Sequence, residues 1–465
     1  MRHIEDIDYY RRRKRKGGLK RWIIGFLLLL VIFSLLVLMG IFRQDSAGSK
    51  SALSEEEMQA LIPKGRELAL AGDCFGCHTR EGGERGAGGV AIKMEPLGTI
   101  YSTNITPDRE FGIGHYTRED FHRALKDGIG KERGNLYPAM PYVFTHITTD
   151  EDIDALYAYL MSLPPLAIPN AQNSGIFAWP IRPFLNFWTL LNFPDRHLPH
   201  NSDRSDAWNR GAYLVEGLAH CGACHSPRNF MMGVDFKEAL SGGFEDGLVI
   251  PDITAETLAK RGYSPEDLSE YLATGIAPEG VSFAGMETVT HFSTSEMNRE
   301  DINAMATYLL TDSAGKLLTP KRSPIVINQI KGEMKRADLI AGRDHYLAAC
   351  ATCHGVEGHG IPHVAPALAG NAIVMMQDPQ TLIALVLKGI ATTPYSNGER
   401  MYAMPGFEGA LTPKEIADLL NWVRAEWGNI DQPIGTIRED RVKEDRIEEE
   451  SVSAEEATLP ADTPL

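Results

Sequence analysis

The six cysteines of this 465-residue chain fall into three copies of one pattern, in which two cysteines separated by two residues are followed at once by a histidine. The copies occupy residues 74–78, 221–225 and 350–354. Two thiols at this spacing can add to the vinyl groups of a porphyrin as thioethers, while the adjacent histidine reaches the iron. The pattern therefore predicts three covalently bound haem c groups, held by Cys74, Cys77, Cys221, Cys224, Cys350 and Cys353, with His78, His225 and His354 as proximal iron ligands.

Other uses of paired cysteines fit this pattern less well. Disulfides suit an exported protein, but they do not explain a histidine after every second cysteine. Two pairs of cysteines can share one zinc ion, which leaves the third pair without a partner. A thioredoxin-like redox pair requires a βαβ context that the sequence does not show. Haem attachment accounts for all three copies.

The sixth iron ligand decides what each haem does, because a haem with histidine and methionine ligands is closed to substrates and suited to electron transfer. One methionine follows each haem histidine at a similar place in the chain: Met140, Met286 and Met404. We therefore predict these three as distal ligands. Packing in a hydrophobic core is the ordinary use of a methionine, and Met401 and Met94 are competing candidates.

The elements that must hold these residues recur three times. Each motif follows a short apolar helix pattern that begins at a glycine: Gly65, Gly211 and Gly342. Each is also followed by an amphipathic helix pattern with acidic residues near its start, beginning at Thr148, Met297 and Leu411. A helix that carries the haem motif and a second helix that closes over it are typical of a small cytochrome c domain. We predict an all-α fold of three tandem class I cytochrome c domains plus one N-terminal transmembrane helix.

The N-terminal segment differs from the rest of the chain in charge. Residues 1–21 are rich in arginine and lysine, whereas the whole chain has a net charge of −16. The uncharged run at 23–42 is about as long as a bilayer core is thick, and basic residues precede it. We expect a membrane anchor, with the bulk of the chain in the periplasm at the cytoplasmic (inner) membrane of a bacterium. A cleaved signal peptide is the alternative, and it also exports the chain.

Composition divides the chain into segments. The 27 prolines include a group at 180–194 that breaks regular structure between two repeats. The predicted boundaries are a basic arm at 1–21, an anchor at 22–42, cytochrome c domains at 54–165, 203–315 and 334–430, an aromatic and proline-rich linker at 166–202, and an acidic disordered tail at 431–465.

Specific stretches of the chain resemble a known family. They are GTIYSTNITPDREFGIGHYTREDFHRALKDGI with LYPAMPY between residues 98 and 142, and the later HCGACHSPRN, APALAG and MPGF. Over about residues 54–430 the chain is similar to the triheme cytochrome c subunit of membrane-bound periplasmic alcohol and gluconate dehydrogenases. The resemblance implies electron transfer from a dehydrogenase catalytic subunit to ubiquinone or a terminal oxidase. It also implies the same proximal and distal ligands.

No nucleophile–base pair, phosphate-binding loop or flavin fingerprint is found in the sequence. We therefore expect a membrane-bound electron-transfer subunit without catalytic machinery of its own. The acidic balance argues against nucleic acid as a partner. Two alternatives stay open: a cytochrome c subunit of a terminal oxidase, and a multihaem peroxidase, which needs at least one haem without a sixth ligand.

Overall fold

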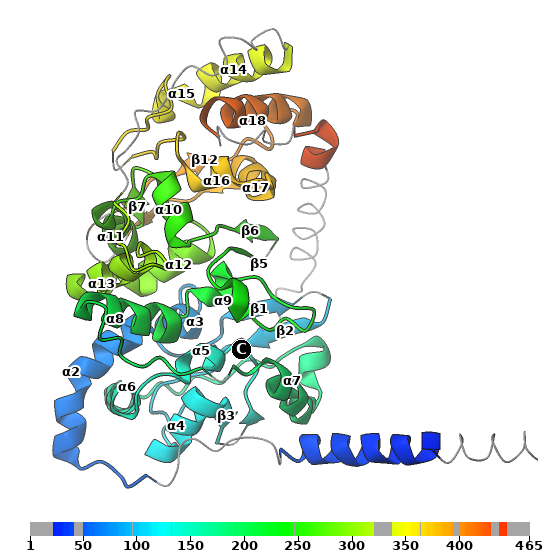
Figure 1. Cartoon of the computed structure of the whole chain (residues 1–465), viewed down its shortest axis with the longest axis vertical. Helices are drawn as coiled ribbons and strands as arrows, with labels where there is room; N and C mark the ends of the chain where they lie inside the picture. Colours follow the sequence, from blue (N-terminus) through cyan, green and yellow to red (C-terminus); the bar gives the residue numbers. More distant parts are fainter. Residues whose placement is uncertain are drawn as a thin grey trace, which may run out of the picture.

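The computed structural model describes residues 22–40, 50–319, 337–428 and 437–443, apart from positions 95, 132, 195, 246, 363, 395–397 and 399. The predicted basic arm and most of the predicted acidic tail lie outside these residues, as do residues 41–49 and 320–336. Figure 1 shows three helical units stacked along the long axis of the molecule. The predicted domain boundaries stay a prediction, and the three units are described below by their elements.

Unit one begins with helix α2, whose start is fixed by a capping box in which Ser54 and Glu57 exchange hydrogen bonds. Its elements are α2 (Glu55–Ala71), α3 (Cys74–His78), β1 (Ala91–Met94), β2 (Gly98–Tyr101), α4 (Arg118–Asp127), β3 (Ile129–Gly130), β4 (Gly134–Asn135), α5 (Tyr142–Thr145) and α6 (Asp150–Ser162). The connection to unit two contains η1 (Gly175–Ala178), η2 (Arg182–Phe184) and α7 (Leu185–Asn192).

Unit two repeats this order with longer loops. Its elements are α8 (Asp206–Tyr213), η3 (Leu214–Leu218), α9 (Gly222–His225), η4 (Phe236–Glu238), β5 (Gly243–Glu245), β6 (Leu248–Ile250), α10 (Ala255–Arg261), α11 (Pro265–Thr274), β7 (Ile276–Ala277), β8 (Gly280–Val281), α12 (Gly285–Phe292), η5 (Thr294–Glu296) and α13 (Arg299–Leu309). The segment η3 is one turn of π-helix.

Unit three lies at the other end of the stack, in yellow to orange in Figure 1. Its elements are α14 (Ala337–Ala349), α15 (Ala351–His354), α16 (Ala372–Met375), α17 (Gln380–Lys388), β9 (Gly389–Ile390), β10 (Thr393–Pro394), β11 (Arg400–Met401), β12 (Met404–Pro405) and α18 (Pro413–Trp427). A capping box of Thr412 and Glu415 starts α18, with Pro413 in its first turn.

In each unit the first and last long helices cross at a glycine. An added Cβ at Gly65 of α2 would lie 1.9 Å from the backbone oxygen of Ala155 in α6. The same contact recurs at 2.0 Å between Gly211 and Ala304, and at 2.0 Å between Gly342 and Asp418. No side chain fits at these distances. The glycines that mark the repeat in the sequence are therefore the points of closest approach between helix backbones.

The prediction of an all-α fold with a transmembrane helix is wrong on two counts. Each unit contains short antiparallel pairs of strands, such as β1 with β2, because the loops between the helices double back on themselves. In addition, no helix in the described part of the chain is long and apolar enough to cross a membrane. The described helix near the N-terminus covers residues 22–38, whereas a span needs roughly 20 apolar residues.

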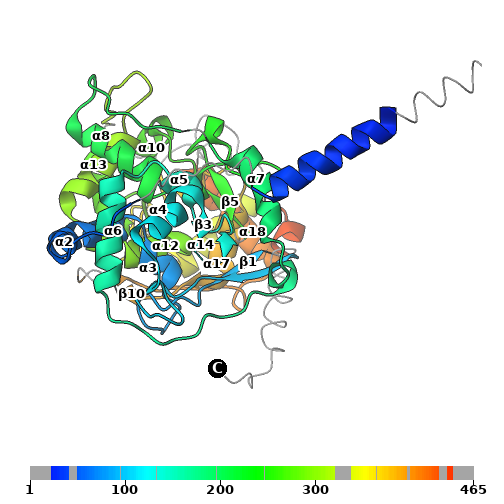
Figure 2. The ribbon, with the colours of Figure 1, turned by 90° about the horizontal axis from the view of Figure 1, so that it is seen from below.

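That N-terminal helix projects from the body in Figures 1 and 2, with most of its apolar side chains exposed. Its end contacts α7, where Asn186 donates a hydrogen bond from Nδ2 to the oxygen of Leu38 at 3.0 Å. The aromatic residues of the connection divide into two groups. Trp188 is partly buried and donates from Nε1 to the oxygen of Met231 at 2.8 Å, whereas Trp179 is 72% exposed.

Candidate haem sites

Each haem motif forms its own short helix, and its histidine is oriented by one backbone carbonyl. The Nδ1 atom of His78 lies 2.5 Å from the oxygen of Thr103, and Nδ1 of His225 lies 2.7 Å from the oxygen of Pro251. In unit three, Nδ1 of His354 lies 2.9 Å from the oxygen of Pro366. A donor at Nδ1 leaves Nε2 as the nitrogen available to a metal and fixes the tautomer.

The histidines are suited to bind metal as neutral imidazoles. Burial lowers the pKa of His78, and the hydrogen bond to Thr103 opposes this effect only in part. Burial likewise lowers the pKa of His225 and His354. Because a metal ligand must present an unprotonated nitrogen, this environment favours coordination at neutral pH.

The carbonyl acceptors are functional groups that sequence reasoning missed, although two of them carry a sequence signal. Thr103 and Pro251 each precede an Asn or Asp, an isoleucine and a threonine. In unit one, Asn104 Oδ1 accepts from both the N–H and the hydroxyl of Thr106, at 2.9 and 2.7 Å. Asp252 does the same for Thr254, at 2.7 and 2.6 Å. This tight turn fixes the chain next to the acceptor carbonyl.

The spacing from the crossing glycine to the first cysteine differs among the units, and the backbone absorbs the difference. In units one and two the residue before that cysteine, Asp73 or His220, has a left-handed backbone with φ of 45° and 37°. Between the crossing glycine and the first cysteine, unit two has one residue more than unit one, and the π-helical turn η3 accommodates this extra residue. Unit three has one residue fewer, and α14 continues to the residue before Cys350.

Each predicted methionine packs against the same hydrophobic cluster as the first cysteine of its motif. Met140 and Cys74 contact the core of unit one, and Met286 and Cys221 contact that of unit two. In unit three, Met404 and Cys350 contact one core, and Met404 lies in β12, paired with Ile390 of β9. Met94 lies in β1, and nothing is described of the Met401 side chain. Ligation of iron by the three methionines stays a prediction.

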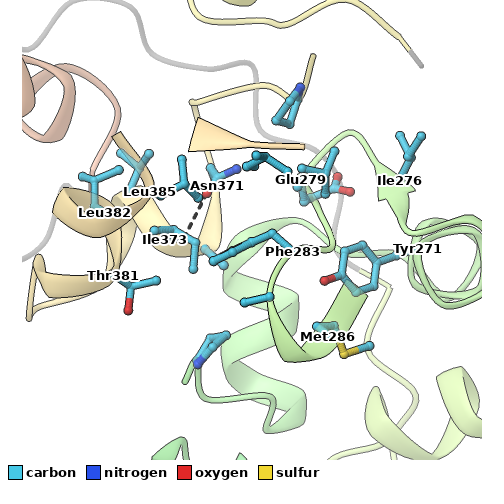
Figure 3. Close-up of a pocket in the computed structure, with 18 of the residues that line it drawn as sticks. Tyr271, Ile276, Glu279, Phe283, Met286, Asn371, Ile373, Thr381, Leu382 and Leu385 are labelled. Carbon is cyan, nitrogen blue, oxygen red and sulfur yellow. Dashed lines mark hydrogen bonds between the residues drawn. The ribbon is translucent and has the colours of Figure 1, made fainter. Parts of the chain in front are cut away.

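The second and third motifs share one cavity of about 530 Å³. Its lining includes all the predicted ligands of both motifs: Cys221, Cys224, His225, Met286, Cys350, Cys353, His354 and Met404. In Figure 3, Tyr271, Glu279 and Met286 come from unit two, and Asn371, Ile373 and Leu385 come from unit three. The predicted ligands of the first motif, His78 and Met140, do not line this cavity.

The residues of the cavity fit haem. Its walls are largely aliphatic and aromatic, as a porphyrin requires, and no disulfide joins any of the six cysteines. Burial raises the pKa of Cys74, Cys77 and Cys221 to about 12, so these groups are neutral thiols at neutral pH when no metal is bound. In the described residues no three His, Cys, Asp or Glu side chains form a metal site of the zinc type.

Comparisons with known proteins agree with these sites. The cytochrome c family profile matches residues 62–164 and 339–427, which hold the first and third motifs. The chain is 37% identical over 405 residues to "Alcohol dehydrogenase (quinone), cytochrome c subunit" of Gluconacetobacter polyoxogenes, covering 82% of this chain and 84% of the relative. It is 35% identical over 402 residues to "Gluconate 2-dehydrogenase cytochrome c subunit" of Pantoea cypripedii, covering 82% and 89%.

A third relative is "Fructose dehydrogenase cytochrome subunit" of Gluconobacter japonicus, which is 34% identical over 406 residues and matches over 82% of each chain. The three relatives are named for different dehydrogenases, and the matched length is nearly the same in each. The similarity therefore extends over most of the length of each subunit and is not tied to one kind of dehydrogenase.

Proposed function

This chain belongs to the family of cytochrome c subunits of dehydrogenases, and on that premise we propose that it binds three haems c and carries electrons away from a dehydrogenase catalytic subunit. The proposed acceptor is ubiquinone or a terminal oxidase. The observation that carries the proposal is the threefold recurrence of one arrangement. In each unit a motif histidine is oriented by a carbonyl, and a methionine and a motif cysteine contact one core.

The count of three haems depends on the middle motif, because the family profile matches only the regions around the other two. Unit two supports the count by its geometry. The contact of His225 with Pro251 repeats that of His78 with Thr103, and the same turn follows both carbonyls. A site built twice in the same way is expected to hold the same group.

When bound, a haem c supplies reversible one-electron chemistry at iron. The residues of this chain then hold the ring and set its potential. The motif cysteines would hold the ring edge, the carbonyl at Nδ1 would orient each histidine and increase its basicity, and a methionine thioether would raise the potential and close the iron to substrates. Because the second and third motifs line one cavity, haems bound there would be neighbours, which would favour electron exchange between them.

We further propose that the three units act in the periplasm, at the outer face of the cytoplasmic membrane. The basic cluster before an apolar run at the N-terminus supports export. The names of the relatives support a dehydrogenase catalytic subunit as the partner. The substrate of that partner is open, since the relatives serve different dehydrogenases.

The haem count is tested on the purified full chain. Mass spectrometry of the intact protein should give three haems, and Cys221→Ala with Cys224→Ala should remove one of them. Cys350→Ala with Cys353→Ala is the matched control and should also remove one. A wild-type chain with two haems, or a middle-motif variant that loses none, would contradict the proposal.

Electron transfer is tested on the complex that co-purifies from membranes. Alcohols, gluconate and fructose are added in turn, and haem reduction is followed in the visible spectrum; a soluble ubiquinone analogue should then reoxidise the haems. All three haems should be low-spin. A high-spin haem together with turnover of hydrogen peroxide would favour a peroxidase instead. The absence of any co-purifying dehydrogenase chain would contradict the proposed partner.

A further inference from the structure

The shared cavity contains one half-buried cation whose role the three haem motifs do not explain. Among the described residues that line it, Arg261 is the only lysine or arginine. Arg261 is the last residue of α10, and its Nη1 donates to the backbone oxygen of Asp252 at 2.7 Å. Asp252 follows Pro251, whose carbonyl orients His225. The guanidinium therefore lies on the wall that carries the proximal ligand of the middle motif.

Arg261 has no carboxylate partner of its own. In the described part of the chain it forms no ion pair, although three acidic residues, Asp73, Glu245 and Glu279, line the same cavity. Burial lowers the pKa of Arg261 below its usual value, despite the opposing effects of Tyr263 and Asp252. A buried charge is costly unless it is paired, so the protein alone leaves this cation under-compensated.

The corresponding place in unit one excludes any side chain. Helices α4 and α11 both begin with a capping box, and a tyrosine, Tyr116 or Tyr263, precedes each capping residue. When these two tyrosines are aligned, Gly114 of unit one corresponds to Arg261 of unit two. An added Cβ at Gly114 would lie 2.4 Å from the backbone oxygen of Pro107. Unit one therefore has no cation at the place that Arg261 occupies in the middle unit.

We propose that Arg261 binds a propionate of the middle haem and raises the reduction potential of that haem. The inference rests on the proposed function, because it requires a haem at Cys221 and Cys224. A haem carries two carboxylates at one edge, and a planar guanidinium is the side chain best suited to pair with a carboxylate. Pairing neutralises a negative charge close to the iron, which favours the reduced state.

Arg261→Gln tests the proposal in the full chain. Three haems should remain attached, since the thioethers and His225 are untouched. In a spectroelectrochemical titration the ratio of reduced to oxidised middle haem at a fixed potential should fall about tenfold, which is 59 mV for one electron. The middle haem is identified as the one whose redox transition is missing from the Cys221→Ala, Cys224→Ala variant. The other two potentials should stay the same.

Two variants separate pairing from other effects of the substitution. Lys260→Gln removes the same charge one residue away, at an exposed position, and should leave all three potentials unchanged. Arg261→Lys keeps a cation and should restore most of the wild-type potential. Unchanged potentials in Arg261→Gln would overturn the proposal.

Two further outcomes are informative. If Arg261→Gln loses the middle haem, Arg261→Lys decides: recovery of the haem with a near-normal potential favours pairing, and loss in both variants shows that Arg261 only packs. If Arg261 instead balances Glu279, the Arg261→Gln, Glu279→Gln double variant will return to the wild-type potential, which also overturns the proposal. A wild-type chain without haem at Cys221 and Cys224 would refute the proposed function itself.

Discussion

Units one and two contact each other through their hydrophobic cores, whereas unit three meets unit two across the shared cavity. Leu70 and Ala71 of α2 belong to the core of unit two, and Leu218 of η3 belongs to that of unit one. The hydroxyl of Ser293 also donates to the oxygen of Leu70 at 2.7 Å. By contrast, the described core cluster of unit three contains residues of that unit and its C-terminal extension only.

The same division is seen at the helix crossings. The residue before the crossing glycine forms an ion pair in the first two units, Lys64 with Asp152 at 2.5 Å and Arg210 with Asp301 at 2.6 Å. In unit three that position is Ala341. The haem motif and the close crossing of helices are present in all three units. The ion pair at this position and the left-handed residue before the first cysteine are found only in units one and two.

Replacement of a crossing glycine should have the largest effect. Gly342→Ala places a Cβ 2.0 Å from a backbone oxygen, so we expect a loss of about 3 kcal/mol in the free energy of unfolding. Unit three should unfold alone, and calorimetry should show one transition shifted to lower temperature. In Gly211→Ala, units one and two should be destabilised together.

Gly409→Ala is the matched control, since no atom lies within 4 Å of an added Cβ there. A single transition that shifts as a whole in Gly342→Ala would contradict the division of the molecule into two parts.

Replacement of a predicted distal methionine should affect the first site differently from the two sites that share a cavity. Met140→Ala should lower the potential of the first haem alone, by a sizeable part of the roughly 0.8 V range that axial ligands span. Met286→Ala should lower the potential of the second haem and also shift the third, because Met286 and Met404 line one cavity. Redox titrations and a new high-spin signal are the measurements. Unchanged potentials in Met286→Ala would show that Met286 is a core residue only.

A smaller effect is expected where units two and three touch. Thr381 accepts from the N–H of Val249 at 2.8 Å and donates to its oxygen at 3.0 Å. Thr381→Val removes both hydrogen bonds, which should cost about 1–2 kcal/mol. The loss should appear as faster proteolysis between units two and three, with no change in the unfolding of unit one. Thr381→Ser keeps the hydroxyl and should behave like the wild type.

The smallest expected effect is a loss of stability of the fold at low pH. Burial acts to raise the pKa of Asp301, but the hydrogen bonds and charge of Arg210 and a hydrogen bond from Asn298 together outweigh it and hold the pKa below the usual 3.8. A depressed carboxyl pKa stabilises the fold above pH 3.8, and this contribution is lost as the pH falls through the folded-state pKa. Between pH 5 and 3 the unfolding temperature of units one and two should fall more steeply than that of unit three. Asp301→Asn should reduce the difference.

Much of the architecture was predictable because each repeat carries its own local signals. The glycines at 65, 211 and 342 and the capping residues mark the helices in the sequence. The short strand pairs were missed because strands of two to four residues leave too little alternation to detect. The shared cavity was not predictable either: it depends on how unit three docks, and residues such as Asn371 and Glu279 meet there from distant parts of the chain.

The shared cavity also has a consequence for biogenesis. Once unit three has docked, its side chains form one wall of the space around Cys221 and Cys224. A haem and the machinery that attaches it need access to that space from outside. We therefore expect attachment at the middle motif to precede the docking of unit three, which agrees with the order of synthesis from the N-terminus. Maturation of this chain is expected to be sequential, with the last unit closing over the haem loaded before it.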